Sequence, residues 1–88
     1  MDADEEIEKC INELLPRIKA GDLEATYDAS RYYHTLAMTR LSWSSFNEFE
    51  RLLVLAKDGG YPEAIEWHKN LDTLKYGFSK RVERRSKT

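Results

Sequence analysis

Apolar residues recur every three or four positions along most of this chain of 88 residues. That spacing puts them on one face of a helix, whereas a strand would need apolar and polar residues to alternate. The pattern predicts helices over 4–19 and 23–40, a third from the serine cluster 42–45 to about 58, and a fourth from Pro62. Beyond the fourth helix, a further apolar stripe is formed by Leu74, Phe78 and Val82. No segment has the pattern of a strand.

Short turn signals separate these segments. Gly21-Asp22 and Gly59-Gly60 each suit the end of one helix and the approach to the next, and Pro62 suits a first helical position. Asp72-Thr73 either breaks the chain again or is passed through. The fold class we predict is therefore all-α: a compact antiparallel bundle of four to five helices with short loops.

Several details of the helices can be predicted as well. Asp2 or Asp4 can cap the first helix, and Pro16 falls on its solvent side. Ser45 followed by Glu48 matches a capping box for the third helix. The residues expected on buried faces include the following three: Leu15, Leu53 and Ile65. An Asp at position 53 or 65 is therefore predicted to unfold the domain.

The segment 23–40 has apolar residues on two faces, which is typical of a helix between two neighbours. A second copy of the chain covering one of these faces, in a homo-oligomer, is the alternative. Length predicts one domain over 1–88, with a frayed basic tail at about 83–88.

The sequence contains no run of about 18 apolar residues, so it predicts no membrane span. Its acidic opening lacks the basic start and apolar core of a signal peptide. Cys10 is the single cysteine, which excludes an internal disulfide and suits a reducing compartment. We therefore expect a cytoplasmic or nuclear protein.

Residue types that carry chemistry are few. His34 and His68 lie on different predicted helices, and Cys10 lies on a buried stripe, where thiols are inert. Neither the spacing of a zinc site nor that of a phosphate loop is present. We expect no enzyme activity, no cofactor and no metal.

The favoured function is a non-catalytic protein–protein interaction or scaffold module, acting as an adaptor for another protein. Aromatic residues are the candidates for contact, because they are enriched at binding hot spots. These candidates are Tyr32, Tyr33, Trp43, Trp67 and Tyr76.

Charge is divided unevenly and supports two alternatives. Residues 1–28 carry nine acids and three bases, whereas residues 29–88 carry seven acids and eleven bases. The basic end could bind RNA, another polyanion or an anionic surface, although the pI of 5.7 is low for such a role. The acidic end would suit a small inhibitor or immunity-type protein. The basic candidates are Lys75, Lys80, Arg81, Arg84, Arg85 and Lys87.

The second half of the chain resembles a known family of helical bundles. This family includes the C-terminal domain of the COPII outer-coat cage subunit and the steroid receptor RNA activator protein. The matching residues are Leu41-Ser42, Leu52-Leu53, Ala56-Lys57, Tyr61, Ala64-Ile65, His68 and Leu71, followed by a similar ending at 77–82 that is one residue longer. The resemblance implies a small bundle that binds proteins in a vesicle coat or in transcriptional co-regulation, with RNA association in the second case and without catalysis.

Overall fold

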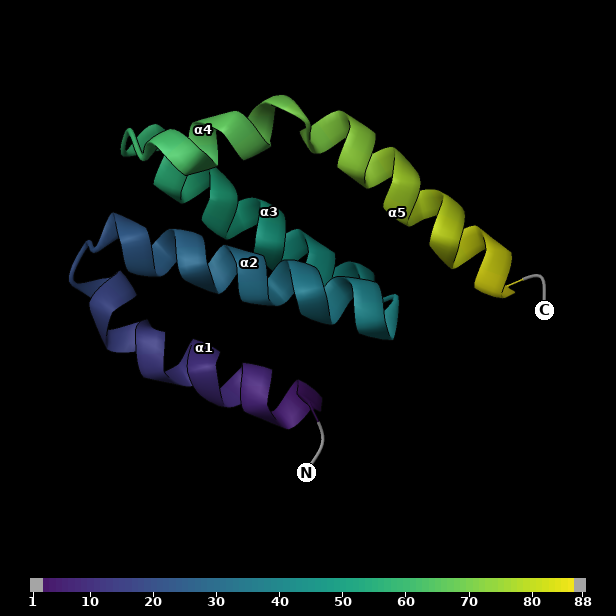
Figure 1. Cartoon of the computed structure of the whole chain (residues 1–88), viewed down its shortest axis with the longest axis horizontal. Coiled ribbons are helices and arrows are strands. Elements are labelled where there is room, and N and C mark those ends of the chain that lie inside the picture. Colours follow the sequence, from purple (N-terminus) through teal and green to yellow (C-terminus); the bar gives the residue numbers. More distant parts are fainter. Residues whose placement is uncertain (1–2, 87–88) are drawn as a thin grey trace.

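The computed structural model describes residues 3–86, which form five α-helices and no strand (Figure 1). This confirms the predicted all-α architecture with short loops. The helices are α1 (Ala3–Lys19), α2 (Leu23–Arg40), α3 (Trp43–Asp58), α4 (Pro62–Lys69) and α5 (Leu71–Ser86).

The first and third turns form for local reasons that the sequence contains. Asp22 caps α2, because its carboxylate accepts a hydrogen bond from the backbone N–H of Ala25 at 3.1 Å. Gly60 has a φ of 90°, in the left-handed region that glycine adopts without strain. A Cβ at Gly59 would lie 2.5 Å from a terminal methyl group of Leu23, so any larger residue at the end of α3 would require this side chain at the start of α2 to move.

The start of α3 differs from the prediction. Ser42 is the capping residue: its backbone is extended (φ −107°, ψ 119°), and its hydroxyl accepts a hydrogen bond from the N–H of Ser45 at 3.3 Å. The predicted Ser45–Glu48 capping box is therefore wrong, and Glu48 instead pairs with Arg51 at 2.9 Å. Leu41 explains the shift, because its left-handed backbone (φ 50°) ends α2 and leaves Ser42 as the extended residue before α3.

Each helix packs mainly against the next one in the chain, so α2 lies between α1 and α3 (Figure 1). This confirms that segment 23–40 is a central helix, which packs against α1 on one side and α3 on the other. Ala25, Ala29 and Ser30 of α2 are completely buried and let its neighbours approach closely. The helices form a flattened layer with principal extents of 43, 34 and 15 Å.

α4 and α5 together cover the other side of α3, and we call them the α4–α5 arm. Asn70 joins them, with backbone angles outside the helical range (φ −103°, ψ 9°), and Asp72-Thr73 is passed through inside α5. The aromatic side chains of α3 and α5 then meet. The Phe78 ring stacks on Phe46 with centroids 4.7 Å apart, and Trp43 meets the same ring edge-on, also at 4.7 Å.

Two residues predicted on buried faces are exposed. Leu15 is 44% exposed, because α1 packs mainly against α2 and buries only a narrow stripe that includes Ile11. Ile65 is 36% exposed, because Ala64 occupies the contact of the short helix α4 and the next residue lies about 100° further round. Leu53, by contrast, is completely buried as predicted.

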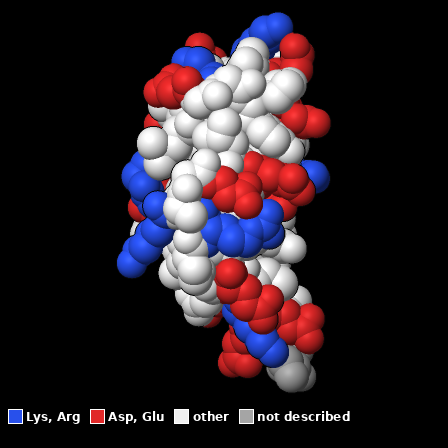
Figure 2. Space-filling model, turned by 90° about the vertical axis from the view of Figure 1, so that its left-hand side faces the viewer, with Lys and Arg blue, Asp and Glu red and all other residues white. Residues whose placement is uncertain are grey.

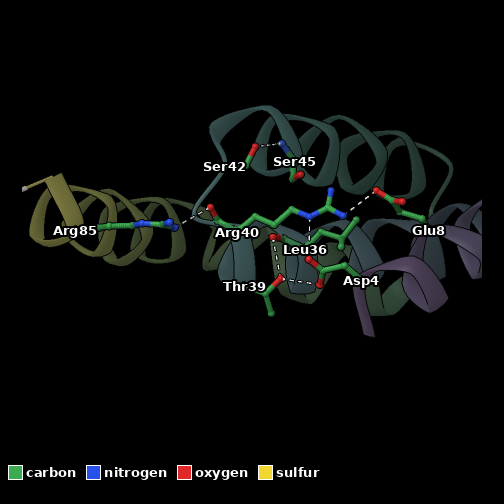
Figure 3. Close-up of polar contacts among 8 residues, drawn as sticks. All are labelled: Asp4, Glu8, Leu36, Thr39, Arg40, Ser42, Ser45 and Arg85. Atoms are coloured by element: carbon green, nitrogen blue, oxygen red, sulfur yellow. Dashed lines mark hydrogen bonds and ion pairs between the residues drawn. The ribbon is translucent and has the colours of Figure 1, made fainter. Parts of the chain in front are cut away.

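Arg40, at the end of α2, joins three helices (Figure 3). Its guanidinium donates to Asp4 and to Glu8 of α1, both at 2.9 Å, and its carbonyl oxygen accepts from Arg85 of α5 at 3.3 Å. Thr39 also donates to Asp4, at 3.3 Å. Asp4 therefore lies inside the first turn and pairs with α2, while Asp2 lies outside the described residues.

α5 continues as a helix to Ser86, whereas the sequence predicted a frayed tail from residue 83. Its contact with Arg40 ties this end to α2 through Arg85. Residues 87 and 88 lie outside the described part of the chain. Within residues 3–86, no helix has both the length and the apolar character needed to cross a membrane.

Candidate functional site

Three neighbouring surface hollows share the side chain of Trp67. Their volumes are about 400, 460 and 350 Å³, and all three are open to solvent. Together we call them the Trp67 groove: two of the hollows lie between α2 and the α4–α5 arm, and the third is lined by residues of the arm and its joint alone. Its lining residues are Tyr27, Asp28, Arg31, Tyr32, His34 and Thr35 of α2, and Pro62, Glu63, Glu66, Trp67, Asn70 and Leu74 of the arm and its joint.

Packing against α2 and α3 holds the Trp67 ring in place. Its centroid lies 5.5 Å from that of His34, in an edge-on contact, and 6.2 Å from that of Phe49. The Arg31 guanidinium lies 5.7 Å from the Trp67 ring, a cation–π arrangement. The tryptophan is therefore a partly exposed ring with a fixed orientation, which costs little entropy when a partner binds.

His34 lies between the groove and the core. Its ring centroid is 4.9 Å from that of Phe49. Burial, and secondly the positive charge of Arg31, lower the pKa of His34, so the imidazole is neutral at pH 7. No group of three or more His, Cys, Asp and Glu in the described residues is placed to hold a metal ion. His34 therefore offers the groove a neutral aromatic ring with one donor and one acceptor.

Acidic residues surround one end of the groove. Tyr27 and Tyr61 pack with ring centroids 5.2 Å apart, and Glu63 lines the hollow beside them. Partial burial, followed by the charges of Glu63, Glu24 and Asp28, raises the pKa of Tyr61. These three carboxylates are therefore close enough to the tyrosine pair to act on it electrostatically. Figure 2 views the molecule from the end with the α1–α2 and α3–α4 turns, where acidic side chains, with basic ones among them, border an uncharged area.

The five aromatic candidates from the sequence do not form one patch. Tyr32 and Trp67 line the same hollow. The Tyr32 hydroxyl also interacts with the Cys10 side chain of α1, and this interaction raises the pKa of Tyr32. Tyr33 lies half-buried in a different hollow, between α1, α2 and the start of α3. Trp43 belongs mainly to the aromatic cluster with Phe78, and Tyr76 is 66% exposed on the outer side of α5.

The basic candidates are also divided. Lys75 forms an ion pair with Glu50 of α3 at 2.7 Å, and Lys80 lies 3.6 Å from Glu83 and 5.4 Å from the Tyr76 ring. Arg85 bonds to the Arg40 carbonyl oxygen. Lys87 lies outside the described residues.

Arg81 and Arg84 are exposed and three residues apart in α5, so they lie on one side of the helix. The basic end therefore presents a smaller free cationic surface than the sequence count predicts.

The sequence pattern indicates only part of the groove. Trp67 and Tyr32 were named as aromatic candidates, but Arg31, His34 and Glu63 were not connected with them. Arg31 and Trp67 are far apart in the sequence, and the packing of both α2 and α4 on α3 brings them together. The local hydrophobic pattern carries no signal for that contact.

Comparison with known proteins finds no matching family model, no matching curated protein and no matching solved structure. The resemblance to the coat and RNA activator bundles therefore stays a prediction.

Proposed function

We propose that this protein is a non-catalytic interaction module that binds a segment of another protein in the Trp67 groove. The observation that carries the proposal is that three hollows meet at one oriented, partly exposed tryptophan. Tryptophan is among the residues that contribute most at protein interfaces, and it does so best in a concave setting with ordered neighbours.

The shape and lining of the groove suit peptide side chains. The largest hollow combines the Trp67 ring with Leu74 and has Asn70 and Glu66 at its polar edge. An aliphatic side chain can lie on the apolar part, while the amide and carboxylate bind the backbone or polar groups of the partner. A role in a vesicle coat or in transcriptional co-regulation is a narrower form of this proposal, which the identity of the partner would decide.

The proposal is tested by affinity capture with the tagged full chain, at low and high salt, with and without nuclease. Asn70→Arg places a long side chain into the largest hollow, at an exposed position. Thr73→Arg is the matched control, because it makes the same charge change at an exposed position nearby that lines none of the three hollows. We expect a protein partner that survives salt and nuclease, is lost with Asn70→Arg and is retained with Thr73→Arg.

A partner retained by both variants would contradict the groove as the binding site. Partners lost to nuclease and high salt, and also lost in an Arg81→Ala/Arg84→Ala variant, would support nucleic-acid binding instead, since phosphate contacts weaken steeply with ionic strength. A toxin or enzyme whose activity the domain blocks would support the inhibitor alternative.

A further inference from the structure

The charges in and around the Trp67 groove are not balanced. Asp28, Glu63 and Glu66 line it, against the single cation Arg31. Within the described chain, Asp28 and Glu63 form no ion pair, while Glu66 pairs with Lys69 at 3.1 Å. Both members of that pair are largely exposed (71% and 64%), so water screens it and it offsets little of the charge.

The smallest hollow combines this negative charge with aromatic surface. It is lined by Tyr27, Pro62, Glu63, Glu66 and Trp67. Aromatic faces carry negative potential, so they attract a cation that lies over them, and carboxylates at the rim add to that attraction. Arg31 lines the neighbouring hollow and not this one, so it leaves this approach to the tryptophan open.

We propose that the segment bound in the Trp67 groove belongs to a partner protein and is basic, with a Lys or Arg side chain in the hollow between Tyr27 and Trp67. This inference rests on the proposed function and adds the chemistry of the partner. The cationic group lies against the partly exposed Trp67 ring, beside Tyr27, which is only 7% exposed, and it donates to the Glu63 and Glu66 carboxylates. An aliphatic neighbour in the same segment covers Leu74.

Charge complementarity favours this occupant over an acidic or uncharged one. An acidic segment would face three carboxylates along the groove and find one cation, Arg31, which already interacts with Trp67. An uncharged segment would partly desolvate the Asp28 and Glu63 carboxylates without giving them a charged partner, which costs free energy.

The test is selection of random twelve-residue peptides, displayed on phage, against the tagged full chain. Selected peptides are then synthesised and titrated into the ¹⁵N-labelled protein, and the amide shifts are mapped by NMR. We expect enrichment of Lys or Arg beside aliphatic residues, with the largest shifts at Tyr27, Glu63 and Trp67. Selection of acidic peptides, or shifts centred on Arg81 and Arg84, would overturn the proposal.

Charge variants give a second, quantitative test with the same peptides. Replacing Asp28 by Asn and Glu63 by Gln removes two carboxylates without changing side-chain size. We expect each to weaken binding roughly threefold, the effect of losing one partly screened charge pair. Glu5→Gln and Glu6→Gln, on the exposed first turn of α1, are the matched controls and are expected to leave affinity unchanged. Equal losses in both sets would indicate unspecific attraction and overturn the site.

Failure of this inference is distinguishable from failure of the proposed function. Suppose that a captured protein partner is lost with Asn70→Arg but binds the Asp28→Asn/Glu63→Gln variant normally. This result would support the groove as a protein-binding site and would contradict the proposal that the bound segment is basic. Self-association that depends on Arg81 and Arg84 would show that a second copy of this chain occupies the groove. It would contradict the proposal that the occupant belongs to a different protein. Analytical ultracentrifugation of the wild type and of Arg81→Ala/Arg84→Ala decides this.

Discussion

The α2–α3 pair and the α4–α5 arm are built differently, although both are helical and both line or support the Trp67 groove. The pair buries small residues of α2 and large ones of α3 against each other, and both of its helices have side-chain caps. The arm contributes Ala64, Leu71 and Phe78 to the core. The groove is therefore bordered on one side by the extensively packed α2–α3 pair and on the other by the α4–α5 arm, which buries fewer apolar residues.

This difference predicts which part of the domain opens first. Local opening needs least free energy where few apolar side chains are buried. Movement of α5 about Asn70 would change the width of the groove at Leu74 while the α2–α3 pair stays intact. The five predictions below test that division of roles, beginning with the largest expected effect.

Leu53→Asp is expected to unfold the whole domain. Leu53 is completely buried at the centre of α3, and an unpaired carboxylate there costs more than about 4 kcal/mol, a large fraction of the stability of a small domain. Far-UV circular dichroism with thermal melting measures the loss. Cooperative unfolding near the wild-type temperature would show that α3 is not the centre of the core.

Phe78→Ala is expected to cost about 3 kcal/mol and to release mainly the arm. Phe78 is 1% exposed and is the main anchor of α5, through its contacts with Phe46 and Trp43. Hydrogen exchange should then speed up in α5 more than in α2 and α3. Tyr76→Ala, at a position that is 66% exposed, is the control and should stay within about 0.5 kcal/mol. Equal loss of protection in all helices would show that the arm is not a separate unit.

Ser42→Ala is expected to destabilise the domain by about 1 kcal/mol, the usual cost of losing an N-cap. Its hydroxyl satisfies the backbone N–H of Ser45, at the start of the well-anchored pair. Chemical denaturation of Ser42→Ala and Ser45→Ala compares the two candidate caps directly. A larger loss for Ser45→Ala would restore the capping box read from the sequence.

Stability is expected to fall as the pH drops below about 6.5, the ordinary pKa of histidine. Burial lowers the pKa of His34 in the folded state, so the unfolded state takes up a proton first and is favoured in acid. The loss continues until the pH passes the lowered pKa of the folded state. Denaturation of His34→Gln at several pH values should show a shallower fall than that of the wild type. If the free energy of unfolding of His34→Gln depends on pH as steeply as that of the wild type, His34 is not the cause of the acid destabilisation. The matched control is His68→Gln.

Ile65→Asp is expected to leave the domain folded, at a cost of roughly 1 kcal/mol and far below that of Leu53→Asp, because its side chain is 36% exposed on the arm and the carboxylate can reach water. Thermal melting beside Leu53→Asp gives the comparison. Unfolding by Ile65→Asp would mean that the arm buries more of α4 than the structure indicates, and would return Ile65 to the core.

The helices and their turns were predictable because their causes are local. Apolar spacing, the glycines at 59 and 60 and Pro62 all act over one or two turns of chain, and the structure reproduces the helices they predicted. The wrong predictions concern features that depend on contacts with neighbouring segments. Ile65 and Leu15 are apolar and suitably spaced, but how much of a helix face is buried depends on how many partners cover it. Ser42 replaced Ser45 as the cap because Leu41 adopts a left-handed backbone.

The candidate site was predictable only as separate residues. Tyr32 and Trp67 were predicted from their chemistry, whereas the contact of Trp67 with Arg31 and His34 depends on how α2 and α4 both pack on α3. By itself the sequence determined an all-helical chain, its turns and the burial of α3, because short-range periodicity and capping set these features. The tertiary structure alone decided which aromatics share a groove and which cations are already paired, because those contacts join residues far apart in the chain.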